Sequence, residues 1–258
     1  MDPFRTHGAI SWPELHTSDA AAAADFYKAI FGWELEAMDM GYGMYHVGKI
    51  GGIPMSGMMK APMDDVPPCW ILYITVDDVD AVVSRATELG GQNFVPAMDV
   101  PEVGRFAGIA DPGGAIIFVM KWDQLGPAVD YTQSFVTPGQ FSWFQLQTPD
   151  VEGSISFYTQ LFGWNTEVNN MGTGPYNIIK IGDVGFGGVI PPMDEGIPAH
   201  WAAYVTVEDA DATAEAVQAN GGTVVAGPFD VETVGRMVAI QDPQGAHLLA
   251  IAYVPMPE

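Results

Sequence analysis

Apolar residues recur along this chain at two spacings, and each spacing predicts a kind of element. Ala22, Phe26 and Ile30 keep the interval of about four residues that places side chains on one face of a helix. The runs 71–76 and 203–207 are short and rich in β-branched or aromatic residues, which is typical of strands. The pattern therefore predicts helices and short strands in alternation.

Acidic residues and glycines bracket the predicted helices. Asp19 precedes the first helix and Gly32 follows it. A carboxylate at a helix start accepts hydrogen bonds from free backbone N–H groups, and a glycine adopts the left-handed conformation that ends many helices. The other brackets are Asp77–Gly90, Asp150–Gly163 and Glu208–Gly221. Because strands flank every bracket, one strand–helix–strands unit is used four times.

The second half of the chain repeats the first. Trp12 recurs as Trp143, 131 positions later, and the same interval relates Asp111 to Asp242. An interval this long indicates a duplicated domain and not a solenoid of short repeats.

The segment between the two copies is rich in glycine and proline and has little periodicity. We interpret residues 125–139 as a linker between one domain at 1–124 and a second at 140–258.

The repeated unit resembles the βαβββ unit of the vicinal-oxygen-chelate superfamily, which contains glyoxalase I, extradiol dioxygenases, fosfomycin-resistance enzymes and bleomycin-binding proteins. Within this superfamily, the chain resembles a two-domain subgroup that includes a mycobacterial culture-filtrate antigen and proteins labelled as hydroxylases in anthracycline gene clusters. The sequences that carry it are Phe26-Tyr27, Phe31-Gly32-Trp33, Val76-Asp77-Asp78-Val79-Asp80-Ala81, Val103-Gly104-Arg105-Phe106 and Asp242-Pro243-Gln244-Gly245-Ala246. The resemblance implies an α+β fold of two tandem glyoxalase-like domains, each a cupped mixed sheet of two βαβββ units.

The resemblance also implies where metal ligands would lie in each cup. Those positions hold apolar residues or glycine: Trp12 or Trp143, Ile71 or Ala202, Phe118 or Leu249, and the pairs Gly57-Met58 or Gly188-Val189. Divalent cations need oxygen, nitrogen or thiolate donors. We therefore expect no metal and no other cofactor, which counts against glyoxalase I or dioxygenase activity.

Alternate residues of a strand share a face, so the first cup receives Glu14 and His16 beside Trp12. We regard Glu14, His16 and Tyr73 as candidate catalytic residues, because a carboxylate and an imidazole can transfer protons while a tyrosine polarises a carbonyl. Candidate ligand-binding residues in this half are Trp12, Trp70, Phe118 and Arg105. Trp12 could equally be core, and Arg105 could pair with a carboxylate.

The second cup has more neutral polar groups. Its candidate ligand-binding residues are Trp143, Gln145, His200, Tyr204, His247 and Arg236. Aromatic walls with a few polar groups are the usual composition of a small-molecule site. Trp143 and Arg236 have the same structural alternatives as their counterparts.

The net charge of the chain limits the classes of partner that it can bind. Nine basic residues stand against 32 acidic ones, for a net charge of −23. Phosphate backbones and anionic membranes repel such a surface, so we expect neither nucleic-acid nor membrane binding. A lone cysteine, Cys69, excludes an internal disulfide, and the N-terminal sequence lacks the features of a signal peptide. We expect a cytoplasmic protein, either a monomer with pseudosymmetric domains or a homodimer.

Three functions remain open. The first is a metal-independent protein that binds a small apolar or aromatic metabolite in a cup-shaped pocket. The second is a metal-independent lyase, isomerase or hydroxylase-like enzyme that uses Glu14 and His16. The third keeps a metal-dependent glyoxalase activity.

Overall fold

A computed structural model describes residues 1–41, 43–63, 65–170, 175–194 and 196–254. The first half forms β1 (Ile10–Thr17), α1 (Ala20–Phe31), β2 (Glu34–Asp39), β3 (Met44–Ile50), β4 (Ile53–Lys60), β5 (Cys69–Thr75), α2 (Val79–Glu88), β6 (Gln92–Val100), β7 (Gly104–Ala110) and β8 (Ile116–Trp122). The second half repeats this order as β9 (Phe141–Gln147), α3 (Val151–Phe162), β10 (Asn165–Asn170), β11 (Pro175–Ile181), β12 (Val184–Ile190), β13 (His200–Thr206), α4 (Ala210–Ala219), β14 (Thr223–Val231), β15 (Gly235–Gln241) and β16 (His247–Tyr253). The predicted βαβββ unit is thus present four times.

Each half contributes one eight-stranded sheet. The order is β2-β3-β4-β1-β5-β8-β7-β6 in the first sheet and β10-β11-β12-β9-β13-β16-β15-β14 in the second. Within each unit the first strand pairs in parallel with the last, as β1 does with β4 and β5 with β8, while the remaining pairs are antiparallel. The sheets are therefore mixed, which confirms the predicted α+β class.

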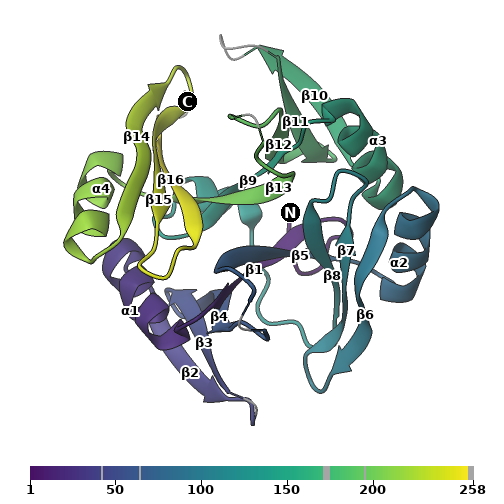
Figure 1. Ribbon diagram of the computed structural model, residues 1–258, viewed down its shortest axis with the longest axis horizontal. Coiled ribbons are helices and arrows are strands. Elements are labelled where there is room, and N and C mark those ends of the chain that lie inside the picture. Colours follow the sequence, from purple (N-terminus) through teal and green to yellow (C-terminus); the bar gives the residue numbers. More distant parts are fainter. Residues whose placement is uncertain (42, 64, 171–174, 195, 255–258) are drawn as a thin grey trace. The chain divides into compact units, whose positions relative to one another are not determined.

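Contacts between residues divide the chain in another way, into two compact units that differ from the βαβββ units. Each compact unit contains segments of both halves of the sequence. The α2/α3 unit comprises Met1–Ser11, Ile71–Thr132 and Trp143–Ala202. The α1/α4 unit comprises Trp12–Trp70, Gln133–Ser142 and Ala203–Glu258. Helix α2 packs on α3 in one unit, and α1 packs on α4 in the other (Figure 1).

A large aromatic residue of one helix packs on a glycine in each unit. A Cβ at Gly91 would lie 3.0 Å from the ring of Phe157 on α3, and a Cβ at Gly222 would lie 2.8 Å from the ring of Phe26 on α1. Any larger residue at these glycines would push the ring outward. The close approach explains why both glycines recur at the interval of the duplication.

The helix starts agree with the sequence in two cases and differ in two. Asp19 accepts a hydrogen bond from the backbone of Ala22, and Asp150 caps α3 in the same way. The caps of α2 and α4 are Asp78 and Asp209, one residue after the predicted brackets. The brackets misplaced these two starts because two acidic residues stand in succession, and only the side chain of the second reaches the free N–H groups of the first turn.

The segment predicted as a linker contains a short 3-10 helix, η1 (Tyr131–Phe135). Tyr131 is buried and donates a hydrogen bond of 3.3 Å to the carbonyl of Phe186 in the α2/α3 unit. Part of this segment is therefore anchored to the protein core. The domain boundaries at 124 and 140 stay a prediction.

Candidate functional site

Four side chains of the α1/α4 unit form a hydrogen-bonded group, which we call the first-half polar cluster: Trp12, Glu14, His16 and Tyr45. The indole N–H of Trp12 donates to the Tyr45 hydroxyl at 3.0 Å. The Tyr45 hydroxyl donates to Oε2 of Glu14 at 2.6 Å. Nε2 of His16 lies 2.9 Å from Oε1 of Glu14. Three of these residues were singled out from the sequence, and the structure brings them together through Tyr45.

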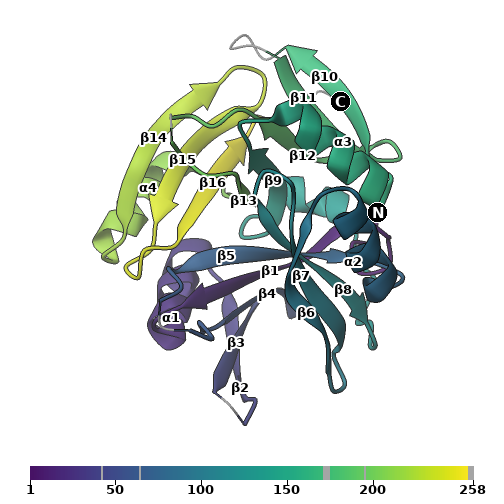
Figure 2. The ribbon, with the colours of Figure 1, turned by 45° about the vertical axis from the view of Figure 1, so that its right-hand side comes forward.

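Strand geometry places these side chains on one face. Trp12, Glu14 and His16 alternate along β1, which lies beside β4 in the ribbon (Figure 2). The two strands are parallel, and Glu14 is paired with Gly57 in their register. Tyr45 comes from β3, the strand on the far side of β4. A side chain at Gly57 would overlap the Tyr45 hydroxyl. Gly57 therefore leaves the space through which Tyr45 reaches Glu14.

The side chains of the cluster are largely buried, and one ring nitrogen of His16 makes no hydrogen bond with the residues that the structure describes. The side chains of Glu14 and His16 are each about one-tenth exposed. Within the described part of the chain, the contact of His16 is with Glu14 through Nε2, and Nδ1 makes no hydrogen bond. Nδ1 is not among the fully enclosed polar atoms without a partner in the described residues, so it keeps accessible surface and is available to a bound molecule as an acceptor or donor.

The second half has a matching cluster in the α2/α3 unit. Trp143 donates to the Tyr176 hydroxyl at 2.8 Å, and that hydroxyl donates to Oε1 of Gln145 at 3.1 Å. Burial raises the pKa of Tyr176 to about 12, so the hydroxyl stays protonated. Gln145 stands where the first half has Glu14, and Gln147 stands where it has His16. This cluster has the same geometry without the carboxylate and the imidazole.

Sequence reasoning did not single out Tyr45 or Tyr176. Two signals mark them: each recurs at the interval of the duplication, and each reaches across a strand position held by glycine, Gly57 or Gly188. The pairing of a tyrosine with a glycine on a neighbouring strand is visible only once the register is known. The sequence alone therefore had no means of linking them to Trp12 or Trp143.

Two further candidates of the first half lie in the α2/α3 unit. Tyr73 on β5 pairs with Phe118 on β8, and their rings lie 5.1 Å apart. Phe106 on β7 completes the group, with its ring 6.1 Å from Phe118. These three rings form an aromatic surface on neighbouring strands. The catalytic role of Tyr73 and the ligand contact of Phe118 stay predictions.

Trp70 belongs to an aromatic core. Its indole N–H donates to the Tyr27 hydroxyl at 3.1 Å, and its ring lies 5.3 Å from that of Tyr27 and 5.3 Å from that of Phe141. The Tyr27 hydroxyl in turn donates to Asp242 at 3.0 Å. Trp70 is therefore enclosed by the aromatic core, and its contact with a ligand stays a prediction.

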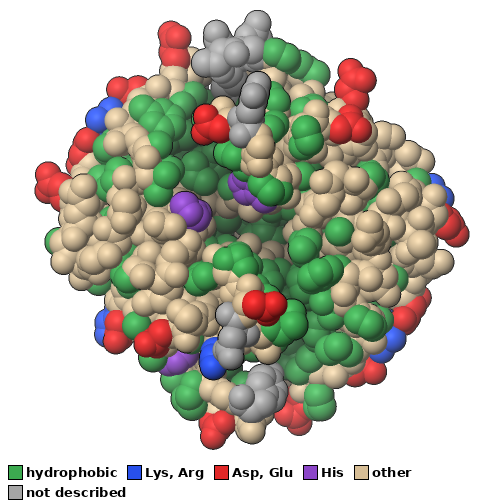
Figure 3. Space-filling view, in the orientation of Figure 1, with side chains coloured by type: hydrophobic (Ala, Val, Ile, Leu, Met, Phe, Trp, Pro, Cys, Tyr) green, Lys and Arg blue, Asp and Glu red, His purple; other side chains and the backbone are tan. Residues whose placement is uncertain are grey.

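The two matched arginines hold carboxylates. Arg105 donates to both oxygens of Asp80 at 2.9 Å and to Asp99 at 3.0 Å. Arg236 pairs in the same way with Asp211 and Asp230. These hydrogen bonds lower the pKa of Asp80 and of Asp211. Each arginine therefore links the start of a helix to a strand hairpin, which agrees with the structural role considered from the sequence. Acidic side chains are spread over the face of the molecule shown in Figure 3.

The remaining candidates of the second half are distributed over both units. Nδ1 of His200 lies 2.9 Å from the carbonyl of Pro198 in the α2/α3 unit. In the α1/α4 unit, Tyr204 is buried on β13, and His247 is exposed beside Gln241. Their roles in ligand binding stay predictions.

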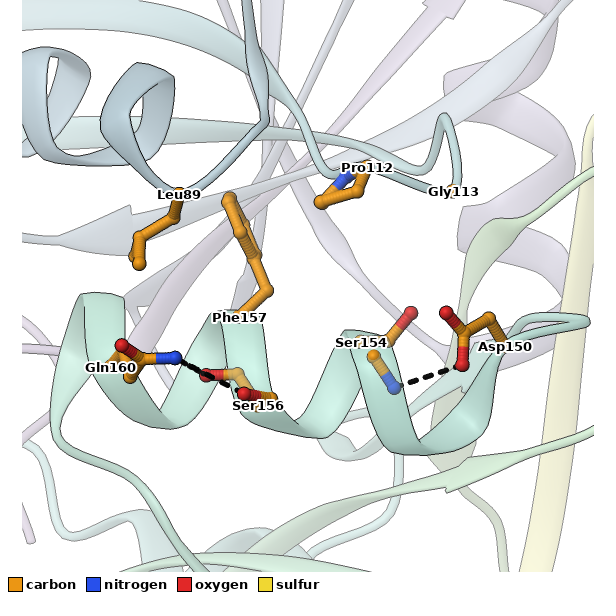
Figure 4. A pocket seen from close by; sticks show the side chains of 9 residues that line it. Leu89, Pro112, Gly113, Asp150, Ser154, Ser156, Phe157 and Gln160 are labelled. Atoms are coloured by element: carbon orange, nitrogen blue, oxygen red, sulfur yellow. Dashed lines mark hydrogen bonds between the residues drawn. The ribbon is translucent and has the colours of Figure 1, made fainter.

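A hollow of about 300 Å³ lies in the α2/α3 unit beside the first turns of α3 (Figure 4). Leu89, Pro112 and Phe157 form its apolar side. Asp150 caps α3, and the amide of Gln160 donates to Ser156 at 3.1 Å. These polar side chains already serve the helix, so the hollow has the character of a packing gap and not of a binding site.

The residues at the positions implied for metal ligands do not fit a metal ion. Trp12 and Trp143 present indole N–H groups, which donate and cannot coordinate. The space at Gly57 and at Gly188 is taken by tyrosine rings. Among the residues that the structure describes, no three His, Cys, Asp or Glu side chains are grouped to hold an ion. A search of the same residues finds no helix with the length and apolar character of a membrane span.

Comparisons with known proteins agree with this architecture. A family model described as Glyoxalase/Bleomycin resistance protein/Dioxygenase superfamily matches residues 140–249. A model of a bleomycin resistance protein-like N-terminal segment matches residues 10–48. Among solved structures, the Mn(II)-bound glyoxalase from Novosphingobium aromaticivorans aligns with a TM-score of 0.66 at 16% identity, over 98% of this chain and 89% of that one. The dioxygenase LapB from Pseudomonas sp. KL28 aligns with a TM-score of 0.66 at 15% identity, over 98% and 95%.

Two relatives match at higher identity over almost the whole length. CFP32 of Mycobacterium tuberculosis, named as a glyoxylase, is 35% identical over 93% of this chain and 92% of the relative. The anthracycline biosynthesis protein DnrV of Streptomyces peucetius is 30% identical over 93% of this chain and 91% of the relative. With both halves built as glyoxalase-type sheets, the chain belongs to the glyoxalase/bleomycin resistance protein/dioxygenase superfamily.

Proposed function

We propose that the protein binds a small apolar or aromatic molecule at the first-half polar cluster and holds it without a metal ion. The observation that carries the proposal is the buried ring of His16, whose Nδ1 makes no hydrogen bond with the described residues. A mostly apolar surface with a few fixed polar groups is the usual composition of a small-molecule site. Trp12 and the thioether of Met59, which lies opposite His16 on β4, supply apolar surface beside the polar atoms.

The kind of side chains present supports the proposed independence from metal. Trp12 can only donate hydrogen bonds, and both oxygens of Glu14 already accept them from Tyr45 and His16. A cation would compete with these hydrogen bonds for the oxygens of Glu14 and would still lack further donors. The proposal therefore uses the cluster for direct contacts with the ligand.

Binding can be measured with a fluorescent apolar probe. The full chain is treated with a chelator, exchanged into metal-free buffer and titrated with 2-naphthol, with and without added Mn²⁺. We expect saturable binding that Mn²⁺ does not change. Trp12→Leu should weaken binding, and the matched control Trp143→Leu should not. Absence of saturable binding across a broad panel of aromatic compounds, or binding only with metal, would contradict the proposal.

A second function is proton transfer. His16 and Glu14 lie 2.9 Å apart, the distance at which a carboxylate orients an imidazole base. Two relatives carry the names of a glyoxylase and of a biosynthesis protein, which favours reactions on carbonyl or aromatic compounds. We propose that His16 would accept a proton from a bound molecule while Glu14 holds the ring.

The duplication supplies a matched test of proton transfer. Glu14→Gln with His16→Gln gives the first half the side chains of the second. The assay follows exchange of carbon-bound protons of small ketones and aldehydes into deuterated water by NMR. Catalysed exchange that the double variant loses supports the function. Exchange that survives in the double variant excludes these residues as its source.

A further inference from the structure

We infer that the Glu14 carboxylate, which also accepts a hydrogen bond from Tyr45, keeps the His16 proton on Nε2 so that His16 presents Nδ1 as an acceptor, and that the ligand is therefore an uncharged aromatic hydroxyl compound of the phenol or enol class. This inference rests on the binding site proposed above and names its ligand class. Glu14 acts here as a positioning residue, since it acts on the ligand through His16.

The direction of each hydrogen bond follows from the chemistry of the donors. An indole nitrogen can only donate, so the Tyr45 oxygen accepts from Trp12 at 3.0 Å. The Tyr45 proton is then free to point at Oε2 of Glu14, 2.6 Å away. A carboxylate can only accept, so Oε1 receives its proton from Nε2 of His16. In the neutral ring the other nitrogen, Nδ1, is left as an acceptor.

An acceptor that a ligand can reach, and that makes no hydrogen bond with the protein, favours ligands that can donate to it. The His16 side chain is about one-tenth exposed, and its Nδ1 has no partner within the described residues. An apolar ligand that cannot donate would leave this nitrogen unsatisfied after water is displaced, which is unfavourable. A ligand hydroxyl removes that cost while its ring lies against apolar side chains.

The negative charge of Glu14 and of the whole chain further restricts the class of ligand. A carboxylate or phosphate ligand would approach the Glu14 carboxylate in a chain of net charge −23 and would be repelled. An ammonium ligand would have to compete with Tyr45 and His16 for the oxygens of Glu14, each of which already accepts one hydrogen bond. A neutral hydroxyl on a flat ring meets neither obstacle.

The second half is a built-in control. Its tyrosine and tryptophan form the same hydrogen bonds, but Gln147 replaces the imidazole and its Oε1 accepts from the backbone N–H of Met193 at 3.3 Å. The Trp143–Tyr176–Gln145 cluster therefore lacks the ring acceptor, and we expect no preference for a hydroxyl there.

Two probes that differ by one methyl group test the ligand class. The full chain is titrated with 2-naphthol and with 2-methoxynaphthalene, which keeps the ring and oxygen but cannot donate. We expect 2-naphthol to bind about tenfold more tightly, the ratio that one buried hydrogen bond supplies. Equal affinities would overturn the inference and leave the proposed function standing. Failure of both probes to bind would contradict the proposed function itself.

The role of Glu14 is read from the tautomer of His16. Nitrogen-15 NMR of the imidazoles, assigned with His16→Gln, should show the His16 proton on Nε2. Glu14→Gln should mix the two tautomers, because an amide can donate to Nε2 as well as accept from it, and should bring the ratio of the two probe affinities close to one. Tyr176→Phe in the other half should change neither. A proton on Nδ1 in the unaltered protein, or a tautomer unaffected by a folded Glu14→Gln, would overturn the assignment. If Glu14→Gln does not fold, the tautomer and the probe ratio of the unaltered protein still decide the outcome.

Discussion

Tyr27 on α1 donates a hydrogen bond of 3.0 Å to Asp242, which lies 215 residues later in the chain. The hydroxyl also accepts from Trp70, so a phenol buried in the core of the α1/α4 unit joins the first βαβββ unit to the last. Tyr158 has the same relationship with Asp111 and Trp201 in the α2/α3 unit. Each Asp-Pro turn is therefore tied to a helix of the opposite half.

Tyr27→Phe should destabilise the protein by about 1–3 kcal/mol, because it leaves a buried indole N–H and a buried carboxylate oxygen without their partner. Tyr158→Phe should cost a similar amount in the other unit. Urea denaturation followed by circular dichroism measures both free energies of unfolding. A loss within experimental error for either variant would show that the hydroxyl is not a structural tie.

Gly57→Ala should displace Tyr45, because the added carbon overlaps the tyrosine ring and hydroxyl. We expect a loss of about 1–3 kcal/mol in stability, typical of overpacking, together with weaker binding of 2-naphthol. Gly188→Ala is the control, since it displaces Tyr176 and should cost stability without affecting that binding. Combining Gly57→Ala with Tyr45→Ala should cost less than the sum of the two, as the overlap is then absent. Additive losses would contradict the contact.

Ser154→Ala should cost about 1–3 kcal/mol in stability, because the Ser154 hydroxyl lies 3.1 Å from that of Thr148 in a buried site. The first half already has alanine at the matching position, Ala23, and the buried hydroxyl of Thr17 has no hydrogen-bond partner among the described residues. The reciprocal change Ala23→Ser should therefore stabilise the protein. Thermal and urea unfolding of the two variants should move in opposite directions, and a shared direction would refute the comparison.

Alkaline pH should weaken the fold before the buried tyrosines ionise. Burial raises the pKa of Tyr176 to about 12, and burial followed by a nearby aspartate raises the pKa of Tyr27 and of Tyr158. A raised pKa in the folded state means that the neutral form is favoured there. The stabilisation is then complete below the unfolded value of about 10 and is lost as pH rises through the folded values.

The expected result is a free energy of unfolding that falls from about pH 10 to 12. Ultraviolet titration of phenolate, compared with urea unfolding at each pH, measures it. Nine tyrosines that all titrate near pH 10 in a protein that is still folded would contradict the burial of these three.

Local patterns determined the elements of this protein. The spacing of Ala22, Phe26 and Ile30 predicted α1, and the interval from Trp12 to Trp143 predicted a second copy of the same sheet. Periodicity and turn chemistry act over a few residues, so they can be read along the chain. The starts of α2 and α4 were off by one because adjacent acidic residues compete for the cap, and only backbone geometry selects between them.

The composition of the candidate site was partly visible as well. Glu14 and His16 share a face because alternate residues of a strand lie on the same side of the sheet. The same alternation was enough to predict that both lie beside Trp12. That Tyr45 crosses Gly57 to reach Glu14 depends on the register of three strands. That α1 packs on α4, and α2 on α3, depends on contacts between segments far apart in the sequence. The repeated elements and their faces can thus be read from the chain. Which side chains meet depends on the folded sheets, because a hydrogen bond between strands requires a register and a distance that no local pattern encodes.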